Sequence, residues 1–158
     1  MSRVKFKQIL YQVIKYAPTQ LLNASFTKIK KFEGLRKDEY GRVYAYARTY
    51  STKVYNYKLR QFVKKRHVKT HHTFIMINPA KGNVVLSCSC DDFKYRHEVA
   101  LYKRGGAEIE YSNGFLPHKT NPRNRFTCCK HCLRLYDFLS KRYPKVFVPN
   151  ADLTDAIG

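Results

Sequence analysis

Four side chains in two short motifs have the types and spacing that point to metal chemistry. A C-x-C pair in the run VVLSCSCDDF supplies Cys88 and Cys90, and a C-x-H pair in TCCKHCL supplies Cys129 and His131. Successive side chains of a strand alternate between its faces, so Cys88 and Cys90 point the same way if residues 84–86 begin a strand. Three thiols and one imidazole match the number and type of ligands that tetrahedral zinc takes in a structural site. The two motifs therefore predict bound Zn²⁺.

Disulfide bonds are the main alternative for the five cysteines of the chain. Their number is odd, and the first residues lead into a charged amphipathic segment rather than the apolar stretch of a secretory signal. No apolar run approaches the length needed to cross a membrane. These features favour a cytoplasmic protein, and clustered cysteines in a reducing compartment indicate metal binding.

The residues alone leave the ligand set open. Cys129-x-x-Cys132 could act as a zinc knuckle, which would replace His131 by Cys132 as the fourth ligand. His97 and His118 are further candidates between the two pairs. Since lone histidines are more often surface or packing residues than ligands, neither is included in the predicted site.

The order C-x-C…C-x-H resembles the SWIM-type zinc finger. The C-S-C-x-D-F signature of that family corresponds to CSCDDF at residues 88–93, and its closing C-K-H-L-like helix corresponds to CKHCL at residues 129–133. The likeness extends over roughly residues 44–142, although the insert at 91–128 is longer than in many SWIM fingers. The run DFKYR, the long loop and the N-P before the closing motif look most like phage-encoded SWIM proteins, which implies a host-cytoplasmic or virion location.

The resemblance also selects among the candidate ligands. It implies Cys88, Cys90, Cys129 and His131, and it leaves Cys132 as a small hydrophobic residue of the core. Four protein ligands close the coordination shell of zinc, whereas a catalytic zinc keeps one position open. The sequence also lacks a glycine-rich nucleotide loop. We therefore expect a protein that is not an enzyme and has no small-molecule substrate.

The charge of the chain is high and unevenly distributed. The formal net charge is +20; residues 1–80 carry 18 Lys/Arg against 3 Asp/Glu, and residues 81–158 carry 13 against 8. Such a basic field attracts polyanions, because each neutralised phosphate releases condensed counterions. The candidate nucleic-acid-binding residues belong to two basic runs: Lys30 and Lys31, and Lys64, Lys65, Arg66 and Lys69.

Tyrosines are interleaved with the basic residues at positions 44, 46, 50, 55 and 57. Aromatic and basic side chains together can stack and clamp a single-stranded nucleic acid. For any one tyrosine the favoured alternative is packing across a sheet, because tyrosine has a high β-propensity.

The first forty residues predict helices. Apolar residues with i, i+3, i+4 spacing predict an amphipathic helix over 6–17, which Pro18 ends. A short helix is expected over 19–24, residues 26–32 are ambiguous between helix and loop, and Gly34 is expected to stop the segment.

After residue 42 the apolar period changes to two. Alternation over 43–50 and again over 53–59 predicts a hairpin, and a third strand is expected over 73–77. A turn at 78–83 leads into a fourth strand that enters the first ligand pair. The predicted fold class is α+β, a small antiparallel β-meander with helices.

The remaining elements surround the second ligand pair. A helix capped by Asp91 or Asp92 is expected to run to Lys103, followed by a polar loop over 105–126. The last helix is expected over 129–142, so the zinc site would join a strand end to the start of this helix.

The predicted organisation has three parts. They are an N-terminal helical extension (1–41), a SWIM-type zinc-binding domain (42–143) and a C-terminal tail (144–158) that is loose from residue 149.

Two classes of function fit these observations. The first is a zinc-binding module that engages DNA or RNA through its basic N-terminal half. The second is an adaptor in a larger assembly, such as a phage virion, in which the N-terminal helix of the adaptor packs on a partner protein. If it does not, the apolar stripe of this helix must pack on the sheet of its own chain. SWIM domains are associated with both DNA and protein contacts, and the charge asymmetry favours the first class.

Overall fold

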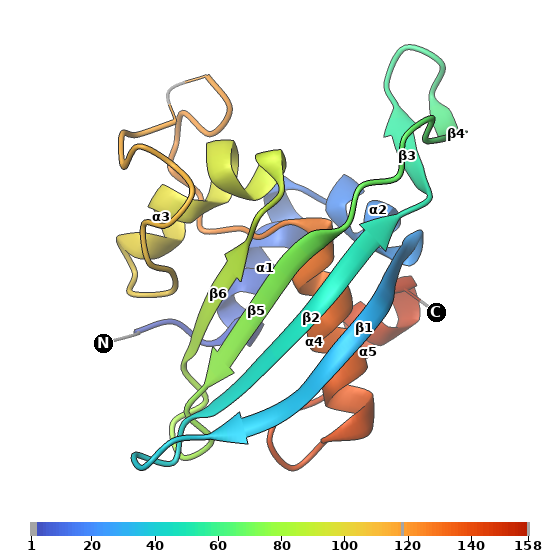
Figure 1. Cartoon of the computed structure of the whole chain (residues 1–158). Coiled ribbons are helices and arrows are strands. Elements are labelled where there is room, and N and C mark those ends of the chain that lie inside the picture. The colour runs from blue at the N-terminus through green and yellow to red at the C-terminus, as the bar shows by residue number, and fades with distance from the viewer. Residues whose placement is uncertain (1–2, 118, 158) are drawn as a thin grey trace.

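A four-stranded antiparallel sheet is the framework of the computed structural model, which describes residues 3–117 and 119–157 (Figure 1). The strand order is β1-β2-β5-β6, with β1 at Thr27–Lys37, β2 at Val43–Ser51, β5 at His71–Ile77 and β6 at Val84–Cys88. With the helices described below, this sheet confirms the predicted α+β class and the predicted antiparallel connections from β5 to β6.

The two faces of the sheet differ in the way that the alternating sequence predicts. On β2, Val43, Ala45 and Ala47 are buried, whereas the intervening Tyr44 and Tyr46 point to the opposite face. An antiparallel sheet commonly has one face packed on the core and the other exposed to solvent.

Helices cover the buried face (Figure 1). They are α1 (Phe6–Tyr16), α2 (Thr19–Ser25), α4 (Lys130–Arg142) and α5 (Ala151–Ile157). The predictions for α1, α2 and α4 are confirmed within one or two residues. Helix α4 contacts all four strands of the main sheet, and the Phe32 ring of β1 lies edge-on to Phe138 with centroids 5.2 Å apart.

The apolar stripe of α1 is buried within the chain. Phe6, Ile9, Leu10 and Val13 belong to the same hydrophobic cluster as the sheet and α4. The Phe6 ring stacks on Tyr136 of α4 with centroids 3.7 Å apart and an angle of 2° between the ring planes. The chain itself therefore covers the apolar stripe of α1, for which the sequence allowed either a partner protein or the sheet of the same chain.

The predicted hairpin between residues 43–50 and 53–59 is wrong. β2 pairs with β1 and β5, whereas β3 (Lys53–Asn56) pairs with β4 (Gln61–Lys64) in a separate two-stranded sheet that extends beyond one end of the main sheet (Figure 1). Only Thr52 separates β2 from β3, and a hairpin needs a connection of at least two residues.

The interpretation of residues 26–32 as helix or loop, with a stop at Gly34, is also wrong. Residues 27–37 form the edge strand β1, and Gly34 lies within it at φ 84°. The pairing register shifts between Ile29 and Lys31 and again between Phe32 and Leu35. Each shift breaks the period of two that identifies a strand in a sequence, and bulges and lysines are ordinary features of an edge strand.

Two expectations for the C-terminal half need correction. Asp92 occupies the N-cap position of the helical segment that follows the first ligand pair, but its side chain forms no capping hydrogen bond because its carboxylate contacts His97 and Gln20 instead. Residues 149–157 are not a loose tail, and residue 158 lies outside the described residues: α5 follows Asn150, whose side chain accepts a hydrogen bond from the Asp152 amide, and it buries Leu153 and Ile157. The hydrophobic cluster of the described residues thus includes side chains from each of the three predicted parts of the chain.

The packing of α1 predicts the effect of shortening Phe6. Phe6→Ala should lower the free energy of unfolding by about 3–5 kcal/mol, because it removes a buried ring and leaves a cavity against α4. Tyr11→Ala, at a position on α1 that is 59% exposed, should change it by less than about 0.5 kcal/mol. Equilibrium denaturation in urea measures both, and equal small effects would contradict a core role for α1.

Candidate metal centre

The structure brings the four sequence-selected residues into one buried cluster. The candidate ligand atoms of Cys88, Cys90, Cys129 and His131 all lie within 4.8 Å of one another. All four side chains are buried, and all five cysteines of the chain are free thiols. The cluster has the donors and the spacing to hold a metal ion.

A strand end and a helix start position these ligands. Cys88 is the last residue of β6, where it pairs with Thr73 of β5, and Cys90 follows two residues later. Cys129 is the N-cap of α4, and His131 lies in the first turn of that helix. The two motifs therefore meet where the sheet and the central helix begin to pack.

The sulfur atoms have hydrogen-bond partners of their own. The Phe93 amide donates to the Cys90 sulfur at 3.3 Å, and the Thr73 hydroxyl lies 3.6 Å from the Cys88 sulfur. Thr73 in turn contacts the Thr49 hydroxyl at 2.8 Å, which links the cluster to β2. Hydrogen bonds of this kind orient metal ligands and tune their basicity.

His131 has no hydrogen-bond partner for either ring nitrogen within the described part of the chain. Its side chain is only 2% exposed, so it has almost no contact with bulk water. A buried polar group without a partner is costly, and native structures rarely keep one. A metal ion bound to one of these nitrogens would supply one of the two missing partners and so lower this cost, which means that the cluster fits a metal.

Burial and mutual hydrogen bonding set the protonation of the thiols. Hydrogen bonds from Cys129 and Cys88 lower the pKa of Cys90, whereas burial raises the pKa of both Cys88 and Cys129. Negative charge in the cluster is therefore held more readily by Cys90 than by Cys88 or Cys129. A cation that recruits the other two sulfurs must displace their protons, so metal affinity should fall as the pH falls.

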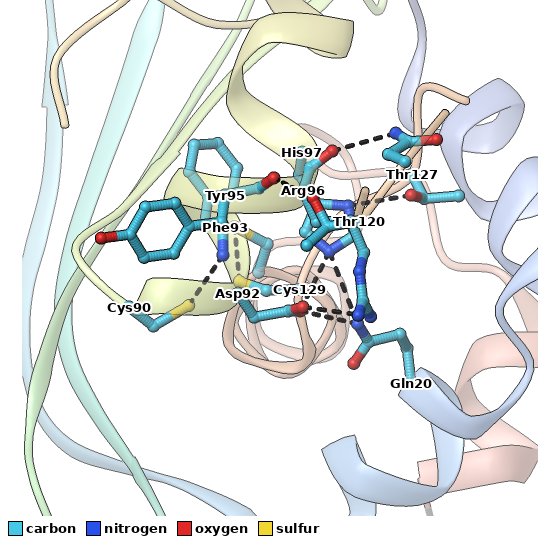
Figure 2. A network of polar contacts seen from close by, with 12 residues as sticks. Gln20, Cys90, Asp92, Phe93, Tyr95, Arg96, His97, Thr120, Thr127 and Cys129 are labelled. Carbon is cyan, nitrogen blue, oxygen red and sulfur yellow. Dashed lines mark hydrogen bonds and ion pairs between the residues drawn. The ribbon is translucent and has the colours of Figure 1, made fainter. Parts of the chain in front are cut away.

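A buried polar network ties together the two segments that carry the ligands (Figure 2). His97 Nε2 lies 2.9 Å from Asp92, two residues after Cys90, and His97 Nδ1 lies 2.8 Å from Thr127, two residues before Cys129. His97 is fully buried and is not part of the ligand cluster. It fixes the distance between the two ligand pairs.

This network depends on an unusual helical turn. Residues 93–97 form the π-helical segment η1 (Phe93–His97), which continues into α3 (Glu98–Tyr102). A π-turn brings residues five apart onto one face, and Asp92 and His97 have that separation. The α-helical spacing expected from the sequence would not align them, which explains why the sequence does not predict the pair.

The structure also places the remaining candidates. Cys132 lies 3.7 Å from Cys129 by their sulfur atoms, and burial raises its pKa to about 12. Among the described residues, the group of mutually close ligand atoms contains His131 and not Cys132. His118 lies outside the described residues.

His71 is a neighbour of the cluster that the sequence motifs do not reveal. Its ring contacts His131 with centroids 4.7 Å apart, and burial together with the charge of His131 lowers its pKa to about 4. Its Nδ1 is buried and has no partner in the described structure. The pairing of β5 with β6 explains its position. Thr73 pairs with Cys88, the last residue of β6, so His71 lies on the part of β5 that continues past the end of β6.

The candidate nucleic-acid-binding residues fall on two separate elements. Lys30 and Lys31 are exposed on the edge strand β1. Lys64 ends β4, and Lys65, Arg66 and Lys69 follow it before β5; residues 64–69 are called the basic link below. The basic link ends at Lys69, two residues before His71, whose ring centroid lies 4.7 Å from that of His131, so the link leads directly to the metal cluster.

Comparisons of this chain with known protein families, with curated proteins and with solved structures find no match. Within the described ranges, no helix is both long enough and apolar enough to cross a bilayer.

The cluster predicts which substitution removes the metal. His131→Ala should abolish stoichiometric metal binding, and Cys132→Ala should retain it, because only the first removes a ligand. Metal content per chain, measured by mass spectrometry of the purified variants, tests this. Loss of metal from Cys132→Ala alone would instead identify a four-cysteine site.

Proposed function

We propose that the protein is a non-catalytic zinc-binding module that binds nucleic acid through the basic surface of its N-terminal half. The observation that carries this proposal is the largely exposed basic link of residues 64–69, which leads into His71 beside the buried Cys₃His cluster.

The donor set supports zinc as the metal. Three thiols and an imidazole are a common ligand set of structural zinc, and hard cations such as Ca²⁺ and Mg²⁺ prefer oxygen ligands. The resemblance to SWIM-type zinc fingers supports the same assignment. A closed shell of four buried protein ligands leaves no position for substrate, which favours a structural role over catalysis.

The state of the other thiols supports the same conclusion. Burial raises the pKa of Cys128 and Cys132, so neither is an activated nucleophile. Both side chains are buried, and a nucleophile needs access to its substrate.

The basic link is available to a polyanion. Lys64, Arg66 and Lys69 are exposed, and none of them takes part in the ion pairs of the described residues. Lys31 differs, because it lies 3.7 Å from Glu33. The unpaired cations offer their full charge to phosphates, and the energy gained grows with the number of counterions released.

The adaptor role remains a second candidate, supported by a different face of α1. Its apolar stripe is buried, but Tyr11, Ile14 and Tyr16 are exposed on the remaining surface of the helix. Such residues favour protein contacts over phosphate contacts. If the chain is encoded by a phage, a virion protein is the partner to look for.

Neutralising the link distinguishes the two candidates. The triple variant Lys64→Gln, Arg66→Gln, Lys69→Gln should bind single- and double-stranded oligonucleotides more weakly at every sequence. Its plot of log affinity against log salt should flatten by about 0.7–0.9 for each phosphate that the variant no longer neutralises. Fluorescence anisotropy at several salt concentrations measures both quantities.

The matched control is Lys119→Gln, Arg123→Gln, Lys145→Gln, which removes the same three charges from exposed positions in the other half of the chain. It should leave the affinity closer to that of the parent. Equal behaviour of the two variants would show that only net charge matters, and unaltered binding by the first would exclude the link as the contact.

A further inference from the structure

The face of the main sheet that is turned away from the helices is not covered by any described helix (Figure 1). The strand register fixes which side chains share this face. Tyr44 pairs with Met76, Tyr46 with Phe74 and Arg48 with His72, in consecutive rows along β2 and β5. Rows on one face are two residues apart, a distance of roughly 6.8 Å.

The middle of this open face is an aromatic platform. The Tyr46 and Phe74 rings have centroids 4.8 Å apart, and Tyr44 lies 6.0 Å from Phe74. The interpretation that the tyrosines pack across a sheet therefore holds for these contacts. However, Tyr46 is still 48% exposed, so the platform keeps a surface on which another ring can stack.

The face is also hollowed. A groove of about 1090 Å³ passes over Tyr44, Phe74 and Met76 toward the edge strand β6. Its lining includes the cations Arg3, Arg42, Lys81 and Lys103 and the carboxylate Glu108. A hollow of this size, apolar at its base and mostly cationic at its rim, fits a segment of an anionic chain with flat rings better than a neutral peptide.

The neighbouring strand β1 adds cations to these rows of side chains on the open face. Arg36 of β1 pairs with Tyr44, and Lys31 of β1 pairs with Arg48. Arg48 and Arg36 are exposed and form no ion pair among the described residues. Both charges therefore remain available to phosphates beside the rings.

Asp38 and Glu110 are engaged by the protein itself, whereas Glu33 and Glu108 are two further carboxylates that line this face. Asp38 accepts hydrogen bonds from Arg42 at 2.7 Å and from Tyr44 at 2.6 Å, and Glu110 accepts one from Ser87 at 2.9 Å. Hydrogen bonds from Tyr44 and Arg42 outweigh the effect of burial and lower the pKa of Asp38 to about 2. These contacts reduce the repulsion that free carboxylates would exert on a phosphate chain.

One end of the aromatic rows meets the basic link. The row of Arg48 and His72 is the next one toward His71, where the link of residues 64–69 enters β5. A chain that follows β2 and β5 would therefore pass from cations over Tyr46 and Phe74 to the rim of the groove.

We infer that this open face binds single-stranded nucleic acid, with bases stacked on Tyr46 and Phe74 and phosphates held by Arg36, Arg48 and the basic link. The inference rests on the proposed nucleic-acid function and adds a site and a substrate class to it. Stacking platforms accept any base because every base has a π-face, whereas the bases of a duplex are already stacked on one another. The face therefore prefers single strands to duplexes.

The test compares two double variants with the same chemical change. Tyr46→Ala, Phe74→Ala removes the platform, and Tyr11→Ala, Phe115→Ala removes one tyrosine and one phenylalanine that are 59% and 76% exposed elsewhere. The probes are a fluorescent oligothymidylate and a duplex of equal length. The platform variant should bind the oligothymidylate at least about fivefold more weakly for each ring removed, with an unchanged salt slope.

Two further measurements make the outcome decisive. Because Phe74 is partly buried, the single variant Tyr46→Ala is measured as well, and circular dichroism checks that each variant is folded. Sedimentation of the parent and of Tyr46→Ala reports whether this face joins two copies of the chain.

Each result has one meaning. If the parent binds neither probe, the proposed function fails and the inference fails with it. If the parent binds but the platform variant and Tyr46→Ala match their control, the inference fails while the proposed function stands. Equal affinity for the duplex, or loss of a dimer in Tyr46→Ala, also overturns it.

Discussion

Burial of three thiols and an imidazole at one point is the constraint on which the fold depends. The four side chains are at most 4% exposed, His131 lacks hydrogen-bond partners within the described residues, and burial raises the pKa values of two of the thiols. Such a cluster is unfavourable by itself and becomes favourable when a cation replaces the protons, since metal binding of this kind contributes directly to the free energy of folding. With Zn²⁺ and three thiolates the centre would carry one net negative charge, in a chain with a formal charge of +20.

The cluster matters beyond its own residues because of the helix that it anchors. Helix α4 begins next to Cys129 and contacts the four strands of the main sheet as well as α2 and α5. The His97 network sets the approach of its N-terminus to the end of β6, and the Phe6–Tyr136 stack adds α1 to the same layer. Fixing α4 on one face of the sheet leaves the other face free for the aromatic rows and their cations.

Parts of this structure follow directly from the sequence. The alternation over 43–50, the strand entering the C-x-C pair and the helix following the C-x-H pair predict the sheet, the helix and their junction, because each pattern is local and uninterrupted. The edge strand β1 escapes prediction because bulges at two points shift its period. Helix α5 is not predicted because it is short and depends on Asn150 as its cap and on tertiary burial of Leu153.

The candidate site is also predictable only in part: its four ligands are recognisable from residue type and spacing, but their neighbours are not. Asp92 and His97 meet only because η1 is a π-turn, and His71 reaches the cluster only through the pairing of β5 with β6.

Hydrogen exchange of the purified protein before and after chelation tests the metal dependence of the fold most directly. If the fold depends on this centre, we expect about one zinc per chain and strong protection of the amides in β6 and the first turns of α4 against hydrogen exchange. Chelation should then remove that protection and spread the loss through the main sheet, because the ligand-bearing segments separate. The same protection with and without chelator, in a preparation that contains no metal, would contradict it.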